Sequence, residues 1–137
     1  MSTTIYVNLP VKDLGKATAF YEALGYELNP QFSDENASAV VISEHIVVML
    51  LAEPFFSTFT KKEIADATKT TESILCLSAE SREAVDALVD KAFESGGSLS
   101  NDPIDEGFMY GRSFQDPDGH QWEVMWMDVA AAQGQAS

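Results

Sequence analysis

The hydrophobic pattern changes period along the first part of the chain. Apolar and polar residues alternate over residues 5–11, which is typical of a half-buried β-strand. Apolar side chains then recur at steps of three and four, at Leu14, Ala17, Phe20, Tyr21 and Leu24. This spacing predicts a helix with one buried stripe, which begins after Asp13 and ends at Gly25. Further strands are predicted at 26–32, 39–42 and 46–51, the last two as a hairpin.

The second part of the chain repeats this order of elements. A strand is predicted at 73–79, and a helix after Ser81 carries a stripe made by Val85, Leu88, Val89, Ala92 and Phe93. The double glycine at 96–97 ends that helix, and short extended segments follow at Leu99, 108–115 and 120–127. The same offset of 68 positions separates Leu9 from Leu77 and Asp13 from Ser81. Two copies of one strand–helix–strand–strand–strand unit are therefore expected.

The two copies are separated by a segment without regular periodicity. Residues 52–72 contain Pro54, three phenylalanines at 55, 56 and 59, and a short helical pattern at 61–67. The aromatic side chains either fasten this connection to the core, cover a ligand cleft or join a subunit interface. We expect one domain over residues 1–137, with module one at 4–51, the connection at 52–72, module two at 73–127 and a flexible tail at 130–137.

The charge balance narrows the classes of partner. Twenty-two acidic residues against eight basic ones give a formal net charge of −14. Such a chain is a poor binder of nucleic acid or of anionic membranes, whereas its field would attract a cation. An acidic surface also simply favours solubility. No apolar run approaches the roughly 20 residues that span a bilayer, and no secretory signal precedes the first strand, so a cytoplasmic protein is expected.

Candidate chemistry gathers in the last predicted hairpin. The turn Asp116-Pro117-Asp118-Gly119 joins its strands, and in the second strand Glu123 shares a face with Met125 while tryptophans occupy the opposite face. A carboxylate in that position indicates a polar-lined cleft. His45 and His120 are expected to be surface or structural residues, and the single cysteine, Cys76, a small core residue. The sequence has no nucleophile–base pair, phosphate-binding glycine loop or CxxC zinc pattern.

Three features together resemble the vicinal oxygen chelate superfamily, which includes glyoxalase I, bleomycin-resistance proteins and extradiol dioxygenases. They are Val11-Lys12-Asp13-Leu14 with Phe20-Tyr21 and Leu24-Gly25-Tyr26, the doubled module order, and Asp116-Pro117-Asp118-Gly119-His120 followed by Glu123. The resemblance covers about residues 4–127. It implies an α+β fold in which two βαβββ modules form a concave mixed-sheet cup with the helices outside.

The resemblance also implies positions for a divalent metal in the cup. Enzymes of this family take His, Glu or Gln ligands from the first and fourth strands of each module. These positions fall on Tyr6, near Met49, near Ile74 (with Glu72 two residues earlier) and on Glu123, so only Glu123 is a clear ligand if a metal is bound. Tyr, Met and Ile are poor ligands for a hard or borderline divalent ion.

We therefore expect a protein that binds a small organic molecule in the cup, with no cofactor and without the full metal site. The expected ligand-binding residues are Tyr6, Asn8, Met49, Glu123 and Met125. Two alternatives stay open. One is a lyase, isomerase or dioxygenase of glyoxalase type that depends on a divalent metal such as Zn, Ni, Fe or Mn; the other is a non-catalytic interaction module. A homodimer is expected in each case.

Overall fold

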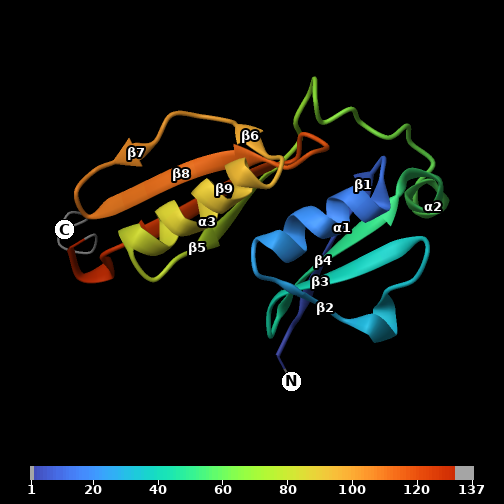
Figure 1. Ribbon diagram of the computed structural model, residues 1–137, viewed down its shortest axis with the longest axis horizontal. Helices are drawn as coiled ribbons and strands as arrows, with labels where there is room; N and C mark the ends of the chain where they lie inside the picture. Colours follow the sequence, from blue (N-terminus) through green and yellow to red (C-terminus); the bar gives the residue numbers. More distant parts are fainter. Residues whose placement is uncertain (1, 132–137) are drawn as a thin grey trace. The chain divides into compact units, whose positions relative to one another are not determined.

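The structure is a computed structural model, which describes residues 2–131 (Figure 1). The chain divides into two compact units, with the boundary between Thr70 and Thr71. The first unit contains β1 (Ile5–Val11), α1 (Leu14–Ala23), β2 (Glu27–Leu28), β3 (Ala37–Ser43), β4 (Ile46–Ala52) and α2 (Glu53–Phe56). The second contains β5 (Ile74–Ser78), α3 (Arg82–Glu94), β6 (Ser98–Leu99), β7 (Ile104–Asp105), β8 (Met109–Gln115) and β9 (Gln121–Met127).

The two units share one sheet topology, except that the second sheet has one more strand, β7, which also pairs with β8. The strand order is β1-β4-β3-β2 in the first sheet and β5-β9-β8-β6 in the second. In each sheet the first strand of the unit pairs in parallel with the last one, and the remaining pairs are antiparallel. The expected repeat of two βαβββ modules and the α+β class with mixed sheets are thus confirmed. The unit boundary lies inside the connection that was expected at 52–72.

In the first unit, α1 covers one face of the sheet. The helix begins where the Asp13 side chain accepts a hydrogen bond from the backbone N–H of Lys16 at 3.0 Å, and it ends before Gly25, whose φ is +104°. Its stripe is buried, with Phe20 and Tyr21 packed edge to face at 5.1 Å between ring centroids. The strands contribute buried side chains from every second residue of one face, namely Val11, Val40, Val48 and Leu50.

In the second unit, α3 takes the equivalent place (Figure 1). Ser81 caps it by accepting from the N–H of Ala84 at 3.0 Å. Its buried stripe (Val85, Val89 and Ala92) packs against the helix-facing residues of the last hairpin, of which Phe114, Trp122 and Val124 are buried. The opposite face of β9, with Glu123 and Met125, is therefore the open face of this sheet.

The turn between β8 and β9 forms as its residue types predict. The carboxylate of Asp116 accepts from the N–H groups of Asp118 at 3.0 Å and His120 at 2.9 Å. Gly119, with φ of +92°, donates its N–H to the carbonyl of Asp116. This closed turn fixes the register in which Gln115 pairs with Gln121 and Ser113 with Glu123.

Several local expectations are wrong. The strand expected at 26–32 is limited to Glu27–Leu28, because Asn29 and Pro30 start a 3₁₀ turn over Pro30–Phe32. No helix forms at 61–67; helical structure occurs earlier, in α2 and in a 3₁₀ turn over Ser57–Phe59, where Pro54 occupies the first turn. Strand β7 was not expected, and Cys76 is exposed rather than in the core because it lies on the open face of the sheet, paired with Glu123.

The tail expected at 130–137 lies mostly outside the described residues, which end at Ala131. Of the helices that the structure describes, none is both long and apolar enough to cross a bilayer.

Candidate functional site

Glu123 lies in the middle of the open face of the second sheet. Its cross-strand partners are Ser113 on β8 and Cys76 on β5, and Met125 follows two residues later on the same face. Met125 is in turn paired with Gly111 and Ser78. The face therefore carries a carboxylate, a hydroxyl, a thiol and a thioether within neighbouring positions.

A small cavity opens beside Glu123. Its volume is about 150 Å³, and it is lined by Asn101, Asp102, Ile104, Gly111, Arg112, Ser113, Glu123 and Met125. One side of the cavity is formed by the segment between β6 and β7, which pair with β8 on either side of this point. A volume of this size accommodates a group about as large as a benzene ring.

Ser113 holds the β6–β7 segment over the sheet. Its side chain is buried, its hydroxyl accepts from the N–H of Asn101 at 2.8 Å, and it donates to the carbonyl of Asn101 at 3.1 Å. Farther along, Arg82 donates to both carboxylate oxygens of Asp105 at 2.9 and 2.8 Å and to the carbonyl of Gly107. The wall of the cavity is therefore fixed by hydrogen bonds at two points.

Arg112, the basic residue in the cavity lining, is already paired with acidic side chains. Arg112 makes ion pairs of 2.9 Å with Asp86 and with Asp90 on α3, and Tyr110 donates to Asp86 at 2.6 Å. These hydrogen bonds, from Tyr110 first and then from Arg112, lower the pKa of Asp86. Within residues 2–131, the side chain of the half-buried Glu123 makes neither a hydrogen bond nor an ion pair. Its carboxylate is therefore free to accept a hydrogen bond from a ligand.

Cys76 and Glu123 influence each other electrostatically. Partial burial raises the pKa of the Cys76 thiol, and the negative charge of Glu123 raises it further. The thiol is thus protonated near neutral pH, which is unsuited to a thiolate nucleophile.

The residues that the resemblance implied for a metal do not fit one. Tyr6, Met49 and Ile74 occupy three of the four positions, and in the described part of the chain no three His, Cys, Asp or Glu residues come close enough to hold an ion. His45 lies 3.4 Å from the hydroxyl of Thr4 and 3.8 Å from Glu44, at a turn of the first unit. His120 lies in the β8–β9 turn.

The other expected ligand-binding residues share a face within the first unit. Asn8 on β1 pairs with Met49 on β4, and Tyr6 lies two residues before Asn8 on the same side of the strand. Tyr6 is 56% exposed and Met49 is half-buried. The structure thus groups Tyr6, Asn8 and Met49 on one sheet and Glu123 with Met125 on the other.

The sequence reasoning missed Gly111, Ser113 and Asn101. A signal for two of them was present, because the tight turn at 116–119 places residues of β8 opposite residues of β9 at fixed positions. Counting back from the turn pairs Ser113 with Glu123 and Gly111 with Met125. Asn101 gave no such signal, since its place depends on how the segment between β6 and β7 crosses β8.

The comparisons with solved structures support the fold. A hypothetical protein from S. aureus is 29% identical and has a TM-score of 0.77, with 92% of this chain and 94% of that chain covered. A glyoxalase-related enzyme from Fulvimarina pelagi is 18% identical with a TM-score of 0.78, over 94% of this chain and 91% of that one. A glyoxalase/bleomycin resistance protein/dioxygenase family enzyme from Burkholderia phytofirmans PsJN is also 18% identical. Its TM-score is 0.75, with 92% of this chain and 99% of that chain covered. At 18% identity the likeness concerns the fold alone.

The search of functionally curated proteins found no match. A model of the Glyoxalase/Bleomycin resistance protein/Dioxygenase superfamily matches residues 4–124. That range contains both βαβββ units up to Val124 in β9. The chain therefore belongs to the Glyoxalase/Bleomycin resistance protein/Dioxygenase superfamily.

Proposed function

We propose that this chain binds a small organic molecule and that Glu123 anchors it through a hydrogen bond. The observation that carries the proposal is the half-buried carboxylate of Glu123, which lines a cavity and has no hydrogen-bond or ion-pair partner among residues 2–131. A ligand group that donates to it, an amine or a hydroxyl, would satisfy this carboxylate.

The rest of the cavity supports a ligand with one polar and one apolar part. Met125 and Ile104 provide apolar contacts, and thioethers adapt to irregular shapes. Asp102 adds a second carboxylate, while the guanidinium of Arg112 is engaged by two aspartates of α3. The local charge thus favours a donor or a cation over an anion.

In the first unit, Tyr6, Asn8 and Met49 are proposed to contact a ligand through the open face of their own sheet. Asn8 supplies an amide that both donates and accepts, and its neighbours supply apolar surface. We propose further that this binding needs no resident metal, because Tyr6, Met49 and Ile74 stand at the other positions that the resemblance implies for metal ligands.

One experiment separates this proposal from a metal-dependent enzyme. Freshly purified protein is analysed for Zn, Ni, Fe and Mn, and its binding of a panel of small amines and alcohols is measured in the presence of a chelator. We expect substoichiometric metal and binding that survives chelation. Glu123→Gln should weaken binding about tenfold or more, the effect of losing a charge-assisted hydrogen bond. Stoichiometric metal, with binding lost on chelation, would favour the metal-dependent alternative.

We also propose a homodimer. Phe59 is 67% exposed and packs edge to face on Phe55, with 5.1 Å between ring centroids. An exposed phenylalanine that packs on a half-buried one gives apolar surface that a second copy would cover. Light scattering at micromolar concentration should give the dimer mass, and Phe59→Ser should shift it toward the monomer. A monomer mass for the unaltered protein would exclude the dimer.

A further inference from the structure

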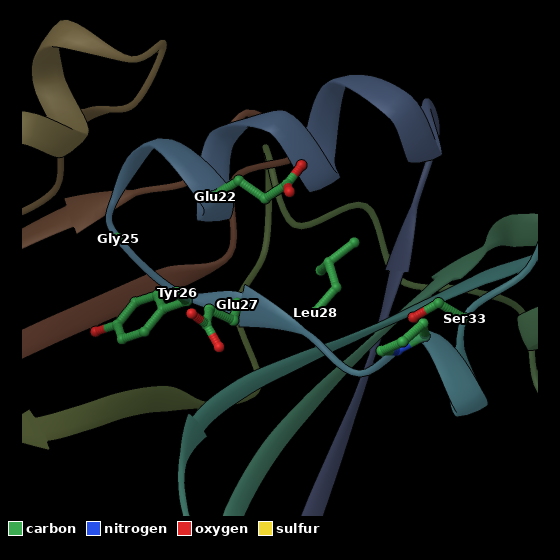
Figure 2. Close-up of a pocket in the computed structure, with 7 residues that line it drawn as sticks. Glu22, Gly25, Tyr26, Glu27, Leu28 and Ser33 are labelled. Carbon is green, nitrogen blue, oxygen red and sulfur yellow. The ribbon is translucent and has the colours of Figure 1, made fainter.

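A second hollow lies in the first unit, away from the open face of its sheet. It has a volume of about 610 Å³ and is formed where α1 ends and β2 begins (Figure 2). Its lining consists of Glu22, Gly25, Tyr26, Glu27, Leu28, Pro30 and Ser33. The hollow is broad and open to solvent, so it can hold one face of a small molecule rather than enclose it.

The lining is negatively charged and contains no basic side chain. Glu22 lies in the last turn of α1, which has no basic residue there, and Glu27 begins β2. A helix C-terminus carries a partial negative charge, so a carboxylate in the last turn is unfavourable and a cation is favourable. Within residues 2–131, neither Glu22 nor Glu27 has an ion pair or a side-chain hydrogen bond. The protein itself thus leaves this charge uncompensated.

The rest of the lining is apolar or aromatic. In Figure 2 the side chain of Leu28 points from β2 toward α1, and Glu22 extends from the end of that helix. Burial raises the pKa of the Tyr26 hydroxyl, so the phenol is neutral at physiological pH. The ring of Tyr26, together with Leu28 and Pro30, therefore gives apolar contact.

We propose that this hollow is a binding site for a small organic cation: an amine that carries an apolar or aromatic group. The ammonium group lies near Glu22, Glu27 and the C-terminal end of α1, and the apolar group lies against Tyr26 and Leu28. The site is made by the first unit alone, so it is independent of Glu123 and of the proposed function.

The test uses benzylamine, with benzyl alcohol as its neutral counterpart, and follows the backbone amides of the full chain by NMR. Benzylamine should shift the resonances of residues 22–28, and benzyl alcohol should bind there at least about fivefold more weakly. Glu22→Gln and Glu27→Gln should each weaken benzylamine binding about two- to fivefold, the range measured for partly exposed ion pairs. Glu63→Gln removes the same charge from an exposed position outside the hollow and should leave the affinity unchanged.

A second measurement distinguishes a binding role from a structural one. Without ligand, Glu22→Gln should raise the Tm, because it removes a carboxylate from the negative end of a helix, while it lowers the affinity for benzylamine. The proposal is overturned by shifts confined to other residues, by equal binding of benzyl alcohol, or by equal weakening in Glu63→Gln. A lower Tm in Glu22→Gln with unchanged affinity would also overturn it, since Glu22 would then have a structural role.

Discussion

Met125 lies across Gly111, its paired residue on the neighbouring strand, and fills the space that a side chain would occupy there. A Cβ atom at position 111 would overlap the Sδ atom of Met125. Gly111 is buried, so the close approach of the thioether to the backbone is possible only without a side chain. Both residues line the cavity beside Glu123.

Gly111→Ala should therefore force Met125 into a new rotamer. The overlapping atoms all belong to the flexible end of the half-buried Met125 side chain, which can move, so urea unfolding should show a loss below about 1 kcal/mol. Gly15→Ala is a suitable control, because Gly15 lies in α1 with no atom closer than 3.6 Å to an added Cβ. That variant should be stabilised by about 0.5 kcal/mol. A loss of about 2 kcal/mol or more in Gly111→Ala would mean that Met125 is held in place and cannot move aside.

The ion pair between Arg82 and Asp105 predicts that the Asp105 carboxyl titrates at an unusually low pH. Hydrogen bonds from Arg82, and then from the N–H of Gly107, lower the pKa of Asp105 from 3.8 to about 2. Because the folded-state pKa is depressed, the pairing stabilises β7 above pH 3.8, and this contribution is lost as the pH falls through about 2. Both side chains are exposed enough for salt to screen the pair.

Carboxyl-detected NMR can follow Asp105 directly. Its midpoint should lie at about 2 in the unaltered protein and should move toward 3.8 in Arg82→Met. Lys91→Met, which removes a cation at the opposite end of α3, serves as the control and should leave the midpoint in place. A midpoint of 3.8 in the unaltered protein would show that Arg82 does not hold Asp105 in solution.

The reactivity of Cys76 reports on Glu123. Because burial and the charge of Glu123 raise the pKa of the thiol, alkylation by iodoacetamide should be slow at pH 7. Glu123→Gln removes the second of these two causes and should speed the reaction about two- to fivefold, as expected for one charge screened by water. Glu72→Gln, an exposed carboxylate that does not affect this pKa, should react at the original rate. Equal rates in both variants would place Glu123 too far from Cys76 to matter.

Sequence periodicity predicted the helices and long strands because burial and turn chemistry agree there. Asp13 and Ser81 cap the two helices, Gly25 ends the first with a positive φ, and the turn at 116–119 sets the register of β8 and β9. The short elements were less predictable. Pro30 ends β2 after two residues, and β7 forms through pairing with β8 that no local pattern encodes.

The candidate site around Glu123 was likewise predictable only in part. The shared face of Glu123 and Met125 follows from the two-residue period of a strand, and the structure has it. The role of Gly111 depends on which residue lies across from it, and the wall of the cavity depends on the hydrogen bonds of Ser113 to Asn101. Both are tertiary properties. The hollow beside Glu22 was missed for the same reason, since it exists only because β2 stops early.

The central claim is that Glu123 anchors a small organic ligand without a metal. The most direct measurement is an NMR titration with a panel of small amines and alcohols in a chelator-containing buffer, read at the amides of Ser113, Glu123 and Met125. We predict saturable shifts at these residues and a loss of affinity of about tenfold or more in Glu123→Gln. Glu106→Gln, an exposed charge control in the same unit, should bind normally. Binding that leaves these amides unshifted, or that is equal in Glu123→Gln and Glu106→Gln, would contradict the claim.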